Sequence, residues 1–382
     1  MLLNRARALV EEIAAALGGE PAGDPRRGCD LSSHFAVVVS GEVRLPDVAA
    51  LPQIVTVLEQ DARRAVVVTA EGYPLEVVAA ARKRLGTELL RATGSREYVA
   101  ALEPLPDAAT EEELYAALGL PFRPPELREV GLPDPPDDLL EPAQVRGDLH
   151  AHSTASDGKA SVYEMGLAAR ELGYEYLAIC DHTTSVRVVP GLDADGVRRQ
   201  GEEIAAANER LEPFRLLRGI ECDILPDGSL DLPDDVLAEL EWVQISLHAG
   251  QRWGREPLTK RVVEAMRHPA ARCLSHPKGR ILNHRPENAL DLDRVLEVAL
   301  ATGVAVEVNG LPDRLDLSGA HVREALGAGV KIVCSTDAHS VRGLGNMPLS
   351  VTTARRGGAR GSDVLNTLPL GELQLRSPNL GR

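Results

Sequence analysis

The chain has 382 residues, of which 44% are hydrophobic and 3% aromatic, and this length suggests two or three domains with packed cores. The formal net charge is −15, and residues 1–145 hold 14 Lys and Arg against 24 Asp and Glu, while the remainder holds 28 against 33. Neither part has the overall basic excess of a surface that grips duplex DNA, although this balance leaves room for a local basic patch. No apolar run of about 18 residues is present, so no membrane-spanning helix is expected. The five scattered cysteines favour a reducing, cytoplasmic setting over a disulfide framework or a thiolate zinc site.

The first 130 residues predict a small α/β domain. Glu11 and Glu12 interrupt the apolar stretch at the start of the chain, which favours an amphipathic helix at about 3–17 over a signal peptide. Apolar runs predict strands at 35–41 and 65–70, and helices are expected near 75–85 and 110–118.

A stretch rich in Pro and Asp, Val130–Gln144, separates this region from the rest of the chain. Such a composition is typical of a linker or an extended strap. We therefore predict a first domain at 1–130, a linker at 131–144 and a second domain at 145–382.

Downstream of Arg146, short apolar runs alternate with helix-like stretches. The runs end at Leu149, Ile179, Ile220, Leu247, Leu274, Val308 and Val333, and the clearest helices are expected at 162–173, 193–211 and 258–268. Fully apolar strands that alternate with crossover helices indicate parallel β-structure. Seven repeats favour a closed (β/α) barrel, in which the chemistry lies at the carboxyl ends of the strands.

His, Asp or Glu residues lie at the carboxyl end of nearly every predicted strand. The set comprises His150, His152, Asp157, His182, Glu221, His248, His276, Asp337 and His339. A lone His at a strand end is usually structural, but packing does not require imidazoles at successive ends of one barrel. Nine N and O ligands exceed the needs of one ion, so two or three divalent cations are implied, and imidazole with carboxylate suits zinc, manganese or iron. The remaining histidines, His34, His268, His284 and His321, fit no such pattern and are expected to be ordinary.

Three basic residues lie in loops just beyond predicted ligands. Arg187 follows His182, and Lys278 and Arg280 follow His276. They are candidates for holding a substrate phosphate, and solvated surface bases are the alternative. Glu307 and Asn309 end the one strand without a ligand, and they are predicted either to support the ligands or substrate or to be simple polar filling.

The order of these motifs (HxH, a following Asp, DH, GxE, SxH, HP and TDAH) resembles the ligand set of PHP (polymerase and histidinol phosphatase) domains. The resemblance implies an α/β fold, a distorted (β/α)7 barrel, with a trinuclear metal site. By motif, one ion takes His150, His152, Glu221 and Asp337, a second takes Asp157, His182 and His339, and a third shares Glu221 with His248 and His276. Metal ions in such a site polarise phosphoryl oxygens and activate water, which implies hydrolysis of phosphate esters.

Further segments are similar to bacterial family X DNA polymerases that carry a PHP region. They are HPKGRIL (276–282), TDAHSVRGLGNM (336–347), DVLNTLP (363–369), ATGSREY (92–98), EEELYAALGLPFRPPELRE (111–129) and, more weakly, AGDPRRG (22–28). The resemblance implies that the first domain is a small nucleotidyltransferase-like palm and thumb region, truncated because the sequence begins at the first helix of the palm.

This region departs from the polymerase pattern where the chemistry should lie. The family's Gly-Ser pair is Gly23-Asp24 here, and its metal-binding aspartates align with His34, Ala36 and the neighbourhood of Arg64. Polymerisation needs carboxylates that hold two Mg²⁺ ions at the nucleotide phosphates. We therefore expect no polymerase activity.

The leading hypothesis is a metal-dependent phosphoesterase, with 3′–5′ exonuclease or 3′-end processing activity on single-stranded DNA ends. A small-molecule phosphatase of histidinol-phosphate or nucleotide type is the nearest alternative, and the negative charge favours it. A non-catalytic DNA-repair accessory, in which metals only brace the fold, is the alternative from another class.

Overall fold

The computed structural model describes residues 1–41 and 45–375. The chain forms two compact units, Met1–Asp137 and Asp138–Arg382, and the division between them falls within the predicted linker. No helix of the described ranges is long and apolar enough to cross a membrane.

The first unit contains a five-stranded mixed sheet. Its strands are β1 Gly19–Gly23, β2 Phe35–Ser40, β3 Ile54–Gln60, β4 Arg64–Thr69 and β5 Pro74–Ala80. They lie in the order β1-β2-β5-β4-β3, in which β2 and β5 are parallel and the other neighbours are antiparallel.

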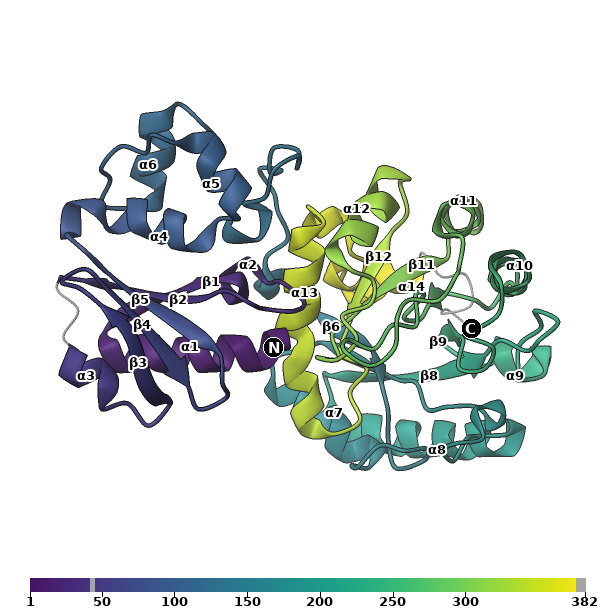
Figure 1. Ribbon diagram of the computed structural model, residues 1–382. Coiled ribbons are helices and arrows are strands. Elements are labelled where there is room, and N and C mark those ends of the chain that lie inside the picture. The colour runs from purple at the N-terminus through teal and green to yellow at the C-terminus, as the bar shows by residue number, and fades with distance from the viewer. Residues whose placement is uncertain (42–44, 376–382) are drawn as a thin grey trace. The chain divides into compact units, whose positions relative to one another are not determined.

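Helices α1 Leu3–Leu17 and α4 Leu85–Thr93 lie on opposite faces of this sheet, and α5 Arg96–Leu102 and α6 Glu111–Leu118 pack with α4. The shorter helices are α2 Asp24–Arg27 and α3 Leu45–Ala49. Successive residues of a strand point to opposite faces, so Val37 of β2 packs with α1 while Val38 packs with Leu89 of α4. Figure 1 shows α1 and α4 on the two sides of the sheet.

The second unit is a barrel of seven parallel strands. They are β6 Gly147–Ala151, β7 Tyr176–Ile179, β8 Arg215–Asp223, β9 Trp242–Ser246, β10 Cys273–Leu274, β11 Ala305–Asn309 and β12 Ile332–Ser335. Their order in space is their order in the chain. A parallel bridge between Ala151 and Ala338 brings the end of β12 back to β6, so the barrel is nearly closed. Leu149, Leu217 and Val333 fill its interior.

Helices surround the barrel (Figure 1). They are α7 Val162–Glu171, α8 Ala194–Leu211, α9 Asp234–Ala238, α10 Arg255–Met266, α11 Leu292–Thr302, α12 Gly319–Gly327, α13 Met347–Arg356 and α14 Leu370–Leu375. Several begin at a side-chain cap that accepts an orphan backbone N–H of the first turn, as Ser161 does for α7 and Asp193 for α8.

The structure confirms the predicted α/β fold class, the barrel and most elements. The helix expected near 75–85 is wrong, because residues 74–80 form β5, which pairs with β2 and β4. In β5, Leu75 and Val77 are buried on one face with Val78 facing the other. This two-residue alternation is the strand period, and the helix begins only at Leu85.

Candidate metal centre

The predicted ligands lie at the carboxyl ends of the barrel strands. His150 lies within β6 and Glu221 within β8, while Asp337 follows β12 by two residues. Because the strands are parallel, these ends meet at one rim. The side chains there are enclosed, with exposed fractions from 0% at His150 to 30% at His339.

Ligand atoms of this set form three overlapping groups, in each of which they lie within 4.8 Å of one another. The groups are His152, Asp157, His182 and His339; His150, His152 and Glu221; and His182, Glu221 and His248. They resemble the predicted three-ion partition only in part. His152 also joins the second group, Asp337 is absent from the first, and His182 takes the place of His276 in the third.

Asp337 and His276 border the groups without being members. Asp337 Oδ1 lies 3.1 Å from His152 Nε2 and 3.8 Å from His150 Nε2, and His276 Nε2 lies 2.9 Å from Glu221 Oε1. Both residues have positive φ, 52° and 24°. A positive φ in a residue other than glycine destabilises the folded chain by about 1–3 kcal/mol, and residues with this conformation are concentrated at functional sites.

Several buried atoms at the centre have no hydrogen-bond partner among the described residues. They are His152 Nδ1, His182 Nδ1, Glu221 Oε1 and His276 Nδ1. Glu221 Oε2 lies 2.9 Å from His182 Nδ1, yet that nitrogen makes no hydrogen bond. Buried polar atoms are normally satisfied, so unbonded atoms on these clustered residues fit the coordination of cations. The residues present therefore fit a metal site.

Glu307 holds the first of these ligands in place. It is fully buried and accepts hydrogen bonds from His150 Nδ1 at 2.6 Å, from Ser335 Oγ at 2.6 Å and from the backbone N–H of His276 at 2.7 Å. A proton on Nδ1 leaves Nε2 of His150 with a free lone pair that faces the centre. Of the two interpretations of Glu307 from the sequence, the structure favours support of the ligands.

Asp223 has the same role for His248, and the sequence reasoning missed it. Asp223 Oδ1 lies 3.2 Å from the backbone N–H of His248 and 3.3 Å from Nδ1. Its position in the sequence could have identified it, because Asp223 lies two residues after Glu221 in β8 and its side chain therefore points to the same face of the strand.

The carboxylates and imidazoles of the centre shift one another's pKa values. Burial opposes ionisation of Glu221, but His248, His150 and His182 hold its pKa well below the ordinary value. Burial also opposes the charged form of His182, yet Glu221 and Asp157 raise its pKa to about 10. Burial lowers the pKa of His152 to about 4, with help from His339 and His182. Ionised carboxylates that attract protons to nearby imidazoles also attract metal cations, which bind in competition with those protons.

Two of the three predicted phosphate-holding cations are tied to the backbone. Lys278 and Arg280 are 7% and 9% exposed. Lys278 Nζ donates to Leu290 O at 3.0 Å, and Arg280 Nε donates to Arg314 O at 3.0 Å. These bonds favour a structural role in the loop after β10. Arg187 is exposed, in the loop that follows His182.

A cation that was not predicted lies beside a candidate ligand. Arg314 Nε is 3.7 Å from Asp337 Oδ2, and its side chain is 20% exposed. Arg314 belongs to the loop after β11, the strand without a predicted ligand, and no motif marked it. The half-buried guanidinium lies beside a candidate ligand and still reaches solvent.

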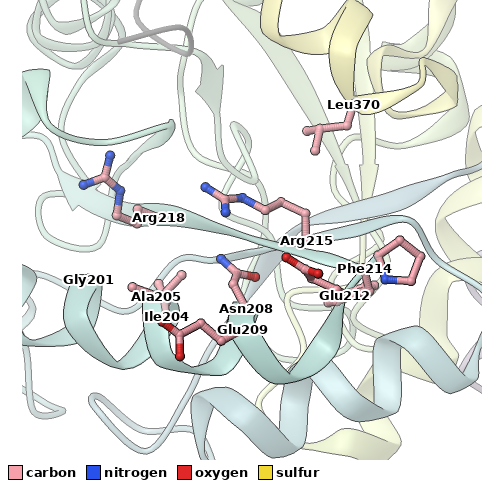
Figure 2. Close-up of a pocket in the computed structure, with 11 residues that line it drawn as sticks. Gly201, Ile204, Ala205, Asn208, Glu209, Glu212, Phe214, Arg215, Arg218 and Leu370 are labelled. Carbon is pink, nitrogen blue, oxygen red and sulfur yellow. The ribbon is translucent and has the colours of Figure 1, made fainter.

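A cavity elsewhere on the barrel holds none of the predicted site residues (Figure 2). Arg215, Arg218, Asn208 and Phe214 are among its lining residues. Arg215 begins β8, whereas Glu221 lies near the end of that strand, so this cavity belongs to the opposite rim. It is separate from the candidate metal centre.

Comparisons with known proteins agree with the resemblance seen in the sequence. The chain is 41% identical over 269 residues to the DNA polymerase/3′–5′ exonuclease PolX of Bacillus subtilis, covering 69% of this chain and 47% of that protein. It is 29% identical over 202 residues to a probable phosphatase of Acetivibrio thermocellus, covering 50% of this chain and 78% of that protein. No family model matches. The resemblance to a bacterial family X DNA polymerase is therefore confirmed, and the chain spans about half the length of this relative.

A solved structure of Leishmania infantum polymerase beta, a ternary gap complex, aligns with 34% of this chain and 70% of that chain. The TM-score is 0.29 and the sequence identity 10%. This likeness is too low to support an argument about either unit.

Proposed function

We propose that the second unit is a metal-dependent phosphoesterase with 3′–5′ exonuclease or DNA 3′-end processing activity, and that the chain has no polymerase activity. The observation that carries the proposal is the convergence of His, Asp and Glu atoms in three overlapping groups at one barrel rim. Similarity to an exonuclease and to a probable phosphatase supports the same chemistry.

Two or three divalent ions, zinc, manganese or iron, would occupy these groups. The proposed ligands are His150, His152, Asp157, His182, Glu221, His248, His276, Asp337 and His339. When bound, such ions polarise the phosphoryl oxygens and lower the pKa of a coordinated water.

The chain's own residues complete the site. Arg314 has a guanidinium beside Asp337 that is partly open to solvent, and we assign it to the phosphoryl oxygens, where it offsets the charge that develops in the transition state. Arg187, which is exposed in the loop after His182, is a candidate for a flanking phosphate. Glu307 fixes the tautomer of His150, and the burial of the ligands keeps bulk water out.

The arrangement of charges in the first unit supports the absence of polymerase activity. Ala36 is buried in the sheet, and the neighbouring carboxylate, Glu76, forms ion pairs with Arg64 and, at 3.8 Å, with His34. Asp24 is occupied by the backbone N–H groups of Ser33 and His34, both at 2.8 Å. We infer that, among the described residues of this unit, no set of free carboxylates remains to hold two Mg²⁺ ions with a nucleotide.

A small-molecule phosphatase is the second candidate. The observation in its favour is that the match to the probable phosphatase covers 78% of that protein, a larger share than for the exonuclease relative. The two candidates share the metal centre and differ in whether a nucleotide strand fits beside it.

The test is digestion of a 5′-labelled single-stranded oligonucleotide with Mn²⁺, comparing the native full-length chain with His150→Ala. We expect a ladder of shortened products from the native chain and none from the variant. If the native chain yields no ladder but hydrolyses p-nitrophenyl phosphate, the phosphatase candidate replaces the exonuclease. If neither substrate is turned over while His150→Ala unfolds at a lower temperature, the centre is structural and the proposal fails.

A further inference from the structure

A cavity of about 920 Å³ opens beside the candidate metal centre. Its lining residues come from two loops, one after β9 and one after β10, and they include His248, which also belongs to the third ligand group. The volume lies within the range of roughly 300–1,000 Å³ that is typical of sites for organic ligands. This pocket is therefore placed to receive the part of a substrate next to the scissile ester.

Trp253 provides an aromatic surface in this pocket. One part of its ring lies over Gly250, where an added Cβ would stand 3.1 Å from Trp253 Cε2, and the Arg261 guanidinium carbon lies 5.2 Å from the ring centroid. Arg261 is fixed in turn by Ala249 O, at 2.6 Å. Although Gly250 and Arg261 contact the ring of Trp253, the residue remains 37% exposed. A braced aromatic ring that is open on one side is suited to stacking with a planar group.

The pocket is lined by two arginines, Arg252 and Arg285, and one acidic residue, Glu287. Arg252 is exposed, and Arg285 is half-buried, with its Nε donating to Gly279 O at 2.7 Å. The acidic member, Glu287, lies 3.9 Å from Arg280, whose positive charge offsets that of the carboxylate. In a chain with a net charge of −15, this local positive charge favours an anionic ligand.

The pocket walls are held together before any ligand binds. Asn288 Nδ2 donates to Gln251 Oε1 at 3.0 Å and to Pro277 O at 2.9 Å, which joins the two loops. Gly279 has a φ of 56°, and a Cβ there would stand 2.3 Å from Gln251 Oε1. Since the walls are preorganised, a ligand loses little binding energy to ordering them.

We propose that this pocket binds the 3′-terminal nucleoside of a single-stranded nucleic acid, with the base stacked on Trp253 and an adjoining phosphate beside Arg285. The proposal rests on the proposed function, because the ester next to that nucleoside must reach the metal centre past His248. A planar base explains the open aromatic ring, and the phosphates of a strand explain the cations. A small aliphatic phosphate would use neither the ring nor the full volume.

The experiment measures binding of a 5′-fluorescein oligonucleotide with phosphorothioate linkages to the full-length chain with Mn²⁺, by fluorescence anisotropy. Base stacking on one aromatic ring corresponds to roughly 5- to 150-fold in affinity. We expect Trp253→Ala to weaken binding within this range and Trp253→Phe to retain most of the affinity. Leu172→Ala is the matched control, because Leu172 is 53% exposed at the end of α7, and it should bind as the native chain does.

A second probe identifies the group that stacks. An oligonucleotide with a 3′-terminal abasic residue should bind the native chain as weakly as the intact oligonucleotide binds Trp253→Ala. Equal affinity of the native chain and Trp253→Ala for the intact strand, or equal affinity of the native chain for both strands, would overturn the assignment. Shortening of an unmodified 5′-labelled oligonucleotide by the native chain reports the proposed function separately, so the failure of one idea is distinguishable from the failure of the other.

Discussion

The two units differ in whether their buried and half-buried charged groups have bonding partners. In the first unit, Glu76 is paired with Arg64 and His34, and Asp24 is paired with Arg27 at 2.6 Å. In the second unit, Glu221 and His182 approach one another within 2.9 Å, yet atoms of both lack hydrogen bonds. A carboxylate that is already in an ion pair is less available to a metal ion. Clustered nitrogen and oxygen atoms without hydrogen bonds are available as metal ligands. The comparison thus separates the unit proposed to bind metal ions from the unit proposed to have no polymerase metal site.

The largest effect should come from Glu221→Gln, which removes the carboxylate shared by two ligand groups. The variant keeps the shape of the side chain but loses the charge that draws cations to His182 and His248. We expect hydrolysis of either substrate to fall by roughly 10²–10³-fold, the scale for losing one preorganised electrostatic contact to the transition state. Steady-state rates with Mn²⁺ measure this, and activity within a few-fold of native would contradict the assignment.

A smaller effect is expected for Glu307→Gln. Glu307 contacts His150 rather than the substrate, and loss of such a supporting residue costs about 10–100-fold in metal affinity or activity. The Mn²⁺ concentration for half-maximal activity should rise, and saturating Mn²⁺ should restore part of the rate. A merely structural role would lower the melting temperature without moving the Mn²⁺ requirement.

The smallest effect is expected for Glu76→Gln in the first unit. Hydrolysis should be unchanged, and the free energy of unfolding should fall by no more than about 1 kcal/mol, since Arg64 is half exposed. The hydrogen bond with His34, followed by pairing with Arg64, lowers the pKa of Glu76 below 4.5, although burial opposes this. A lowered pKa in the folded state contributes stability above the unfolded-state pKa. The difference from native should therefore vanish as the pH falls through the folded-state value, which urea titrations at neutral and acid pH would detect.

The barrel was predictable because short apolar runs alternate with helix-like stretches and the proposed ligands lie at or just after the ends of those runs. Strand β5 was not, because a short apolar run with alanines reads equally as a helix until its partners β2 and β4 are known. Lys278 and Arg280 were predicted, with Arg187, as phosphate contacts because sequence proximity to His276 does not reveal the carbonyls that hold their side chains. Arg314 and Trp253 were missed because neither lies within a ligand motif. Only the folded barrel shows that their loops lie at the same rim as the ligands.

The most direct test of the central claim is the metal content of the full-length chain, measured by inductively coupled plasma mass spectrometry after loading with Mn²⁺ or Zn²⁺ and removal of excess ions. The account predicts about two to three ions per native chain, the same number in Glu76→Gln, and the loss of at least one in Glu221→Gln. Fewer than one ion in the native chain, or the same content in Glu221→Gln as in the native chain, would contradict it.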